Sequence, residues 1–152
     1  MRIYFASQFR AFPVVLALKA KFEAAGHHIV STWHDKEALN LAAVGEARKD
    51  IAEINTAQVF VILTTDCELT RGGLWFEMGY AYSAALQIII LGPRINVFCF
   101  LQDDVEQVDT DEACLEAVAQ YGRDLAECDT AVAAASRFAR LQTGDASMEA
   151  AL

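Results

Sequence analysis

Residues 57–64, Ala-Gln-Val-Phe-Val-Ile-Leu-Thr, constrain the fold of this chain more than any other stretch. The run is almost continuously apolar, and a polar, turn-rich segment follows it at residues 65–73. A run of this kind is expected of a central strand in a parallel sheet, where helices cover both faces. The sequence therefore predicts an α/β protein with this strand in its interior.

Strand-like and helical patterns alternate along the first two thirds of the chain. The predicted strands span residues 2–6, 28–32, 57–64, 87–91 and 96–101. A first helix is predicted from Pro13, which suits a first helical turn, to a stop at Gly26. Two more helices are predicted at 36–56, with an interruption near Gly45, and at 74–86. This alternation predicts a three-layer, flavodoxin-like (Rossmann-like) fold whose five parallel strands take the order 2-1-3-4-5.

The pattern changes after Gln102, where alanine-rich helical sequence replaces the alternation. Two amphipathic helices are predicted there, at residues 111–121 and 125–141 with a break near Gly122, before a frayed end. We expect a single domain over residues 1–152. Its core is predicted at about 2–101, and its acidic helical extension at about 103–142.

The net charge of −9 is concentrated in the last third of the chain. Residues 1–100 hold nine acids and nine bases, whereas residues 101–152 hold twelve acids and three bases. Nucleic acid polymers require a basic surface for their phosphates, so this distribution argues against such a partner.

Neither a membrane segment nor a secretion signal is predicted. No apolar run approaches the ~20 residues that a membrane helix requires. The apolar stretch at residues 11–18 resembles part of a signal peptide, but Lys19 and Lys21 interrupt it, and residues 2–6 read better as a strand. We therefore expect a cytoplasmic protein.

The cysteines and histidines give no sign of a metal site or a redox motif. The four cysteines, at positions 67, 99, 114 and 128, are far apart and form no CxxC pair. The three histidines also lack metal-ligand spacing. We expect reduced and mostly buried cysteines, no metal and no cofactor.

Glu77 is the residue that most clearly points to chemistry. It lies among Trp75, Phe76, Met78 and Tyr80, directly after a Gly-Gly turn. Burying an unpaired carboxylate costs several kcal/mol, so an acid in such surroundings needs a partner or a chemical task. The segment also joins the end of a strand to the start of a helix, where open α/β sheets place their ligand sites.

Other polar residues fall where this fold would gather them near Glu77. They are Tyr4, Ser7 and Arg10 from the first strand and its loop, Asp50 from the helix before residue 57, and Asp66, Arg71, Gly72 and Gly73 from the segment after residue 64. Backbone N–H groups at a helix start favour an anion such as a phosphate or a carboxylate. Each acid also has a structural explanation, since Asp50 can pair with a neighbouring base and Asp66 can end a strand. The residues alone predict a carboxylate-centred small-molecule site at the C-terminal edge of the sheet.

Three of these features together resemble a known family. They are Ile3-Tyr4-Phe5-Ala6-Ser7, an aspartate (Asp50) seven residues before Ala57, and Gly-Gly-x-x-x-Glu-x-Gly-Tyr-Ala at 72–81. The pattern resembles the nucleoside 2-deoxyribosyltransferase family, including the related deoxynucleoside 5′-monophosphate N-glycosidases. The similarity covers roughly residues 2–101 and is most specific in the segment that contains Glu77. The acidic helical tail departs from the short ending of that family.

The resemblance implies a role for each matching residue. Glu77 would be the catalytic nucleophile, Tyr4 would orient it, and Asp50 would lie near the sugar and base. Asp66 would handle the leaving base, although the loop from Asp66 to Gly73 is longer than in the family. Ser7 and Arg10 would contact the 5′ end of the sugar. The resemblance also implies a homo-oligomer that acts on a small nucleoside or nucleotide.

The implied chemistry is cleavage or transfer of an N-glycosidic bond. Positive charge develops at the anomeric carbon as this bond breaks, and a nearby carboxylate can stabilise it or form a covalent glycosyl-enzyme. Trp33, Trp75 or Phe9 could stack on the base or belong to the core. Whether water or a second base resolves the intermediate separates a hydrolase from a transferase. The same scaffold would also suit a non-catalytic nucleotide-binding module or an enzyme that hydrolyses the glycosidic bond of a dinucleotide.

Overall fold

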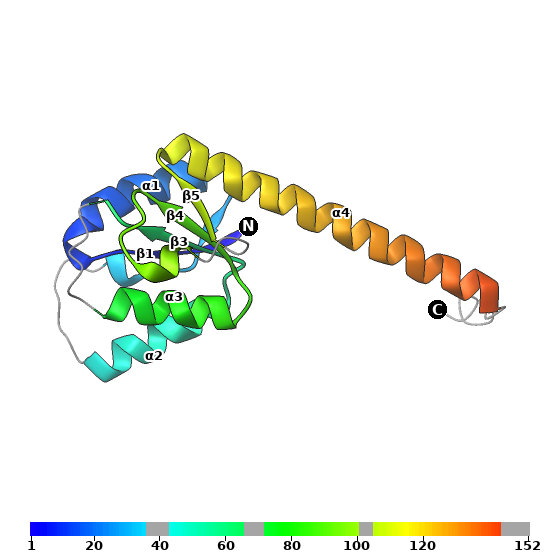
Figure 1. Ribbon diagram of the computed structural model, residues 1–152, viewed down its shortest axis with the longest axis horizontal. Helices are drawn as coiled ribbons and strands as arrows, with labels where there is room; N and C mark the ends of the chain where they lie inside the picture. Colours follow the sequence, from blue (N-terminus) through cyan, green and yellow to red (C-terminus); the bar gives the residue numbers. More distant parts are fainter. Residues whose placement is uncertain (36–42, 66–71, 101–104, 144–152) are drawn as a thin grey trace. The chain divides into compact units, whose positions relative to one another are not determined.

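The computed structural model describes residues 1–35, 43–65, 72–100 and 105–143 of the 152-residue chain (Figure 1). The chain divides into two compact units, residues 1–118 and 119–152, and each is described by itself. The first unit contains the sheet and the candidate site, and the second contains the greater part of the last helix.

The first unit is built on a five-stranded sheet in which all neighbouring strands are parallel. The strands are β1 (Arg2–Ala6), β2 (His28–Ile29), β3 (Val59–Leu63), β4 (Gln87–Leu91) and β5 (Val105–Val108). Their order, β2-β1-β3-β4-β5, confirms the predicted flavodoxin-like α/β fold, and every residue of β3 is buried. Because the chain places β2 on one side of β1 and β3 on the other, the strand order reverses between β1 and β3.

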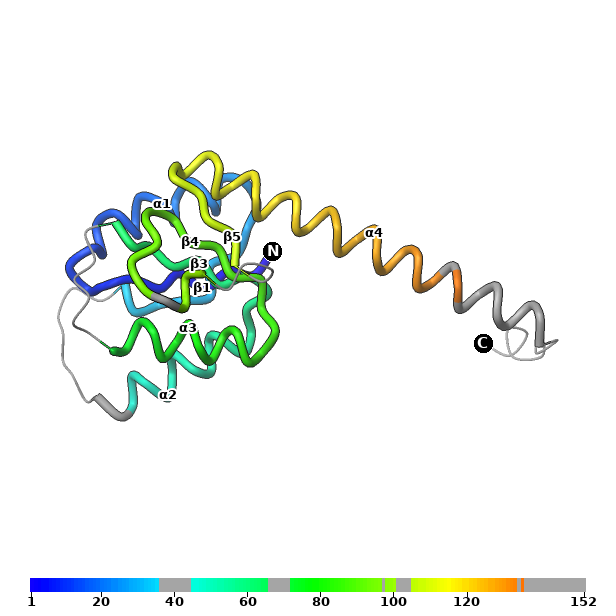
Figure 2. The backbone as a smooth tube through the Cα atoms, viewed as in Figure 1, coloured from blue at the N-terminus to red at the C-terminus, as the bar shows by residue number. Residues whose placement is uncertain are grey.

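Helices cover both faces of this sheet, as Figure 1 and Figure 2 show. One face carries α1 (Phe12–Ala24) and the first turns of α4 (Asp111–Thr143), and the other carries α2 (Ala43–Ile54) and α3 (Gly73–Ser83). Lys21 of α1 forms an exposed ion pair with Asp111, with 2.7 Å between Nζ and Oδ2. Exposed pairs of this kind contribute at most about 1 kcal/mol, so apolar packing holds the layers together.

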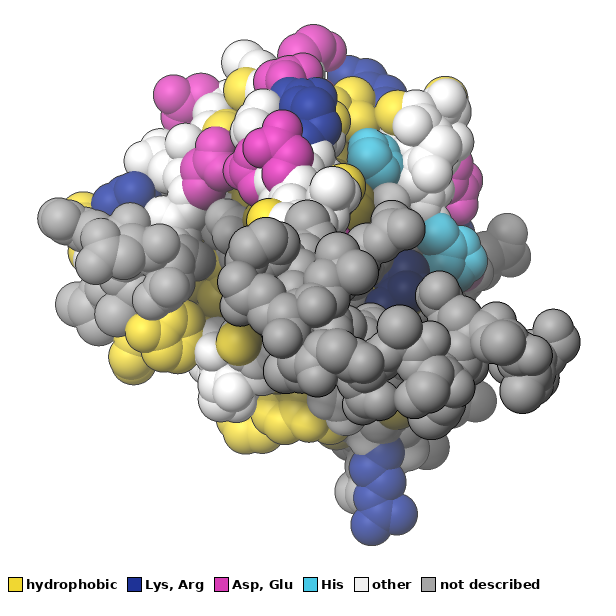
Figure 3. Space-filling view, turned by 90° about the vertical axis from the view of Figure 1, so that its right-hand side faces the viewer, with side chains coloured by type: hydrophobic (Ala, Val, Ile, Leu, Met, Phe, Trp, Pro, Cys, Tyr) yellow, Lys and Arg dark blue, Asp and Glu magenta, His cyan; other side chains and the backbone are white. Residues whose placement is uncertain are grey.

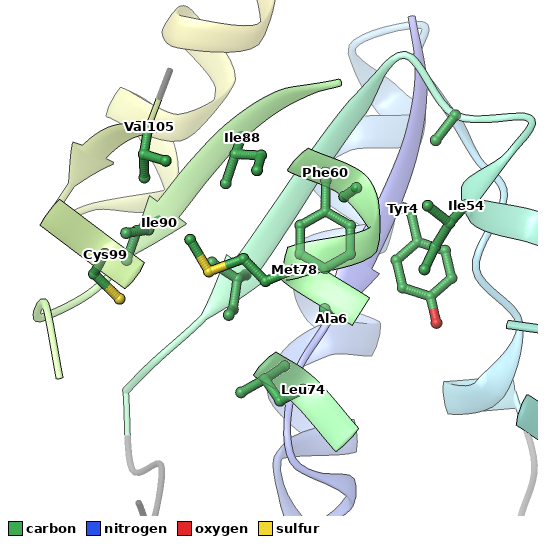
Figure 4. Packing of buried hydrophobic residues seen from close by; sticks show 13 residues of the cluster. Tyr4, Ala6, Ile54, Phe60, Leu74, Met78, Ile88, Ile90, Cys99 and Val105 are labelled. Carbon is green, nitrogen blue, oxygen red and sulfur yellow. The ribbon is translucent and has the colours of Figure 1, made fainter. Parts of the chain in front are cut away.

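The core between the sheet and helices α2 and α3 includes residues of both strands that flank the reversal point. The rings of Tyr4 on β1 and Phe60 on β3 stack with centroids 5.6 Å apart and planes 7° apart. Ile54 of α2 and Leu74 and Met78 of α3 belong to the same cluster (Figure 4). Burying one such side chain contributes roughly 1.5–3 kcal/mol, and the cluster fixes α3 against the sheet.

The predicted position of the fifth strand, residues 96–101, is wrong. Residues Val97–Phe100 form a 3-10 helix, η3, and the fifth strand is β5, a few residues later. The Oδ1 atom of Asn96 accepts a hydrogen bond from the backbone N–H of Phe98 (3.1 Å), and the Asn96 carbonyl accepts one from Cys99 (3.0 Å). Cys99 is buried between the exposed residues Phe98 and Phe100, and this alternation imitates a strand.

The second strand is shorter than the predicted 28–32, because side chains replace the backbone ladder after Val30, whose N–H still donates to the Ile3 carbonyl (2.9 Å). The N–H of Phe5 on β1 donates to the Ser31 hydroxyl (3.1 Å). The N–H of Thr32 donates to the Glu53 carboxylate (3.1 Å), away from the sheet. The chain then enters a 3-10 helix, η2 (Trp33–Asp35).

Ser31, His34 and Asp35 form a hydrogen-bonded series whose residue types match those of a hydrolase triad. Ser31 Oγ lies 3.1 Å from His34 Nε2, and His34 Nδ1 lies 3.1 Å from Asp35 Oδ1. Burial lowers the pKa of His34, so its neutral ring donates to Asp35 and accepts from Ser31. Because Ser31 is fully buried and accepts the Phe5 N–H, the series closes the end of β2 and has no access to a substrate.

The remaining helix boundaries differ from prediction in three places. Helix α2 passes through Gly45 without the predicted interruption and ends at Ile54, two residues before the predicted end; the predicted segment 36–42 lies outside the described residues. Helix α3 ends at Ser83, before Ala85, which adopts a positive φ of 55°. The two predicted C-terminal helices are one continuous helix, α4, that passes through Gly122.

Gly122 does not interrupt α4 because its cost is small and side chains bond across it. A glycine inside a helix costs about 1 kcal/mol relative to alanine. Gln120 donates to Asp124 over a distance of 2.6 Å, and Arg123 donates to Gln120 (2.7 Å). Within the described part of the chain, no helix has the length and apolar character needed to cross a bilayer.

Candidate functional site

The candidate site lies at the carboxyl edge of β1 and β3, where the strand order reverses. Ser7 follows β1, and its hydroxyl donates to the carbonyl of Leu63, the last residue of β3, over 3.4 Å. Helix α3 begins at the same edge, after the segment that follows β3. Ligands of open α/β sheets bind at such a reversal, so the fold itself selects this position.

Tyr4 contributes a buried hydroxyl to this site from the middle of β1. The residue is fully buried, and within the described part of the chain its hydroxyl makes no hydrogen bond. Burial raises the pKa of Tyr4 far above its ordinary value, and the negative charges of Glu77, Asp50 and Glu53 raise it further. The hydroxyl therefore stays neutral and can donate a hydrogen bond, with acidic groups around it.

Glu77 lies in the second turn of α3 and is only partly exposed. Burial raises the pKa of Glu77 to about 8, and the negative charge of Asp50 contributes to the shift. A carboxyl group with a pKa near 8 changes charge close to physiological pH, which is a property of acids and bases at functional sites. The predicted apolar surroundings of Glu77 are thus present, and the charge that acts on it is Asp50.

Asp50 and Glu53 lie three residues apart on α2, but they have different surroundings. The Glu53 carboxylate accepts hydrogen bonds from the N–H and the hydroxyl of Thr32, at 3.1 and 2.7 Å. Lys49 lies 3.6 Å from the same carboxylate. Glu53 is therefore bound to the segment after β2, whereas Asp50 is the acid whose charge acts on both Glu77 and Tyr4.

A hydrogen bond between α2 and α3 fixes the two acids relative to each other. The Tyr80 hydroxyl on α3 donates to the Asn55 side-chain oxygen, which directly follows α2, over 2.8 Å. Tyr80 follows Glu77 by three residues, so the bond lies close to the coupled carboxyl groups. This bond and the shared apolar cluster hold Asp50 and Glu77 in one arrangement.

The start of α3 is open to solvent. Gly72 and Gly73 are both exposed, and a Cβ atom built on either would have no heavy atom within 4 Å. Gly72 caps the helix without a side-chain hydrogen bond, so the first N–H groups of α3 remain accessible to an anion. Arg10 is exposed in the 3-10 helix η1 (Phe9–Ala11), which follows β1.

Three of the predicted site residues, Tyr4, Asp50 and Glu77, are electrostatically coupled in the structure. Ser7, Gly72 and Gly73 lie at the same edge of the sheet. Asp66 and Arg71 lie outside the described residues.

The aromatic residues considered for base stacking have packing roles. Trp33 donates its indole N–H to the carbonyl of Phe5 (2.7 Å) and packs against the core cluster, as does Trp75. Phe9 stacks on Phe12, with ring centroids 5.9 Å apart. These contacts favour a structural role for all three candidate residues.

Sequence reasoning missed Glu53 and Arg94. Glu53 follows Asp50 by three residues, a spacing that places both acids on one face of a helix. Arg94 follows β4 directly after a Gly-Pro pair, and thus lies at the same edge of the sheet as the site. For Glu53 the available signal was its spacing from Asp50 on a predicted helix, and for Arg94 it was its position just after a predicted strand.

The surface and the acid cluster limit the kinds of ligand. Among residues 1–35, 43–65, 72–100 and 105–143, no three His, Cys, Asp or Glu side chains are grouped so that they could hold a metal ion. On the face drawn in Figure 3, acidic side chains are more numerous than basic ones toward the top of the view, with hydrophobic side chains exposed among them. A small molecule bound at the sheet edge fits these features better than a polyanion does.

The fold and the acid cluster define an open α/β protein with a carboxylate site at its strand-order reversal. A solved structure with this fold is that of Clostridium botulinum CMP N-glycosidase, BcmB, with a TM-score of 0.57 and 14% sequence identity. The match covers 80% of this chain and 100% of the other. At this identity the likeness establishes a shared fold, which is the one that the sequence resemblance implies. No family model and no curated protein matches the chain.

Replacing Asp50 with Asn is expected to lower the pKa of Glu77 from about 8. The substitution removes the negative charge that opposes ionisation of Glu77, while the burial that causes most of the shift remains. The value should therefore fall but stay above the ordinary 4.5. Carbon-13 NMR of the glutamate side chains, followed as a function of pH, measures it.

Glu23→Gln on the exposed surface of α1 is the matched control, and it should leave the Glu77 titration unchanged. A wild-type Glu77 that titrates near 4.5 would contradict the burial of this group. An unchanged pKa in Asp50→Asn would contradict the coupling of the two acids.

Proposed function

We propose that this protein cleaves the N-glycosidic bond of a nucleoside or nucleotide, with Glu77 as a carboxylate nucleophile. The observation that carries the proposal is the coupled group of Tyr4, Asp50 and Glu77 at the strand-order reversal. The fold shared with a CMP N-glycosidase supports the same chemistry. Two interacting carboxyl groups in an apolar site are a recurrent arrangement for glycosidic bond cleavage.

In the first chemical step, a carboxylate oxygen of Glu77 attacks the anomeric carbon of the sugar. The C–N bond breaks, its electron pair goes to the leaving base, and a glycosyl ester of Glu77 forms. Asp50 or a water molecule supplies the proton that the base takes up. In the second step, water attacks the anomeric carbon, the bond between this carbon and the Glu77 oxygen breaks, and the proton of the water returns to the group that protonated the base, so that the sugar is released and the Glu77 carboxylate is regenerated.

Tyr4 positions the nucleophile in this mechanism. In the substrate complex its neutral hydroxyl would donate a hydrogen bond to one carboxylate oxygen of Glu77, a bond that the structure of the described residues does not contain, and the other oxygen would then face the sugar. Forming this bond would satisfy a buried hydroxyl that makes no hydrogen bond in the described part of the chain. Because only ionised Glu77 is nucleophilic, the rate is expected to rise with pH toward about 8.

Release of free base from a panel of substrates tests the proposal. The protein is incubated with ribonucleosides and deoxyribonucleosides and with their 5′-monophosphates, and free base is measured by chromatography. Release without an added second base indicates hydrolysis, whereas release that requires a second base indicates transfer. Tight nucleotide binding with no release, unaffected by Glu77→Ala, would instead indicate a non-catalytic binding module.

We further propose that the protein is a cytoplasmic homo-oligomer. Two large side chains of α3 are exposed, Phe76 at 67% and Tyr82 at 42%, and a second copy could cover them. The described cysteines, Cys99, Cys114 and Cys128, are free, as is usual in a reducing compartment. Light scattering measures the molar mass in solution, and a monomer would contradict the oligomer.

A further inference from the structure

The loop that follows β4 is hydrogen-bonded to its neighbours at the carboxyl edge of the sheet. The Thr64 hydroxyl, directly after β3, donates to the carbonyl of Pro93 (2.7 Å). On the other side, the Gln107 side chain of β5 donates to the carbonyl of Gly92 (3.1 Å), and the N–H of Gly92 donates to Val108 (2.9 Å). The loop is therefore bound to the ends of both neighbouring strands, and its next residue is Arg94.

Arg94 is a partly buried cation that lacks an anionic partner in the described structure. Its guanidinium carbon lies 5.4 Å from the centroid of the Phe100 ring, so the planar group is held over an aromatic face. Its Nε atom is buried and has no hydrogen-bond acceptor. None of the ion pairs between described residues includes Arg94, and Asp109 beyond β5 accepts from Gln107 instead.

This arrangement suits the binding of an anion. A guanidinium group cannot lose its proton in a protein, and Arg94 is only partly buried, so the accessible donors of its fork can bind an anion while the buried Nε fixes the stem of the side chain. The planar fork of donors matches the oxygens of a phosphate or a carboxylate, and stacking on an aromatic ring orients the fork in advance.

The position of Arg94 connects it with the candidate site. Hydrogen bonds link successive strand ends along the edge, from Ser7 to Leu63 and from Thr64 to Pro93. Neighbouring strands are about 4.8 Å apart, so the ends of β1 and β4 lie roughly 10 Å from each other. Helix α3, which carries Glu77, packs on both β3 and β4 and starts at this edge. One small molecule can therefore extend from Glu77 toward the end of β4.

We propose that Arg94 binds the phosphate group of a nucleoside 5′-monophosphate whose sugar lies at Glu77. This inference rests on the proposed function and narrows its substrate class from nucleosides and nucleotides to monophosphates. Arg94 acts in binding and not in the bond-breaking steps. Its loss should therefore change the affinity for phosphate-bearing ligands and leave the rate at saturation nearly unchanged.

The test compares each 5′-monophosphate with its own nucleoside in wild-type protein and in Arg94→Gln. Binding of the cytidine, uridine, adenosine and guanosine pairs, in ribose and deoxyribose forms, is measured by titration calorimetry. KM and kcat are measured wherever base is released. Loss of a charged hydrogen bond corresponds to roughly a ten- to hundredfold weaker binding of the monophosphate, with nucleoside binding unchanged. Arg94→Lys should recover only part of this loss, because it keeps the charge without the planar fork.

Arg48→Gln on the exposed part of α2 is the matched control, and it should keep the wild-type preference for monophosphates. Thermal unfolding of each variant separates a binding effect from a loss of folded protein. The inference is overturned if wild-type protein does not prefer any monophosphate to its nucleoside, or if Arg94→Gln keeps that preference. An equal loss for both members of a pair also overturns it.

The proposed function fails in a different way. If no substrate of the panel releases base while Arg94→Gln still removes a preference for monophosphates, Arg94 binds phosphate and the glycosidase chemistry is wrong. If base release is normal and independent of the phosphate, the chemistry stands and the role of Arg94 is wrong.

Discussion

Replacing Glu77 with Gln is expected to lower the rate of base release by a factor on the order of a thousand or more, the scale of effect that follows loss of a catalytic nucleophile. The amide has nearly the same shape as the carboxyl group, so packing around α3 should be retained. It carries no negative charge, and it cannot form the glycosyl ester of the proposed first step.

The same substitution is expected to stabilise the fold at high pH. The pKa of Glu77 is about 8 in the folded protein and about 4.5 in the unfolded chain, so the folded state favours the protonated form. The stability that this preference contributes is fully present below about pH 4.5 and is lost as pH rises through about 8. Each pKa unit corresponds to about 1.4 kcal/mol, so the loss is on the order of a few kcal/mol. Glu77→Gln removes this dependence because the amide does not ionise.

Thermal unfolding at about pH 5 and about pH 9 measures the stability effect. Wild-type protein and Glu77→Gln should unfold at similar temperatures at the lower pH, and the variant should be the more stable of the two at the higher pH. Glu23→Gln, the same change at an exposed position, should keep both the activity and the stability of the wild type. A fully active Glu77→Gln would disprove the nucleophile assignment, and an unchanged pH dependence of stability would disprove the raised pKa.

The sheet could be predicted from the sequence because its central strands are continuous apolar runs. Residues 57–64 and 87–91 are mostly apolar, as expected of strands that are buried between two layers of helices, and β3 and β4 lie within them. Glu77 could be recognised as a candidate site residue for a related reason, because its sequence neighbours are apolar. Where burial alone determines the structure, the local composition of the sequence is enough to predict it.

The errors arise where a few polar contacts decide the structure. Residues 98–100 alternate between exposed and buried like a strand, but two hydrogen bonds to Asn96 turn the chain into η3. β2 ends early because Ser31 takes the place of a backbone acceptor. The contacts of Asn96 are local, but burial alternation in the same segment favours a strand; the contact of Ser31 joins residues 26 positions apart, and no short window of sequence contains both partners.

The candidate site could be predicted from the sequence only in part, because its residues come from segments that are far apart in the chain. Tyr4 and Asp50 were candidates because of their predicted place in the fold, and the family resemblance suggested their roles; their coupling to Glu77 follows from the packing of β1, α2 and α3. In the sequence, Arg94 belongs to no motif, and only its position after a predicted strand marks it. The evidence for its role is structural: its Nε is buried, its guanidinium group contacts Phe100, and strand ends surround its loop.

Replacing Gly92 with Ala is expected to destabilise the protein by roughly 2–5 kcal/mol, from a left-handed backbone and a steric overlap together. Gly92 has a φ of +115°, which side chains rarely adopt. A Cβ atom there would lie 2.8 Å from the hydroxyl oxygens of both Thr64 and Thr65, and 3.0 Å from the backbone nitrogen of Thr65. Thr64 cannot easily move away, because its hydroxyl is bonded to the carbonyl of Pro93.

Gly26→Ala separates the two contributions to that loss. Gly26 has a φ of +84°, but a Cβ atom there would meet nothing within 4 Å, so its replacement should cost only the backbone strain of about 1–2 kcal/mol. Urea unfolding measures both variants. Removing the Thr65 hydroxyl in Gly92→Ala/Thr65→Ala should restore part of the stability, because the two sites are in contact and their effects are not additive. Equal losses for Gly92→Ala and Gly26→Ala would mean that the loop after β4 yields to the added methyl group, and the hydrogen bonds of this loop would then not hold Arg94 in a fixed place.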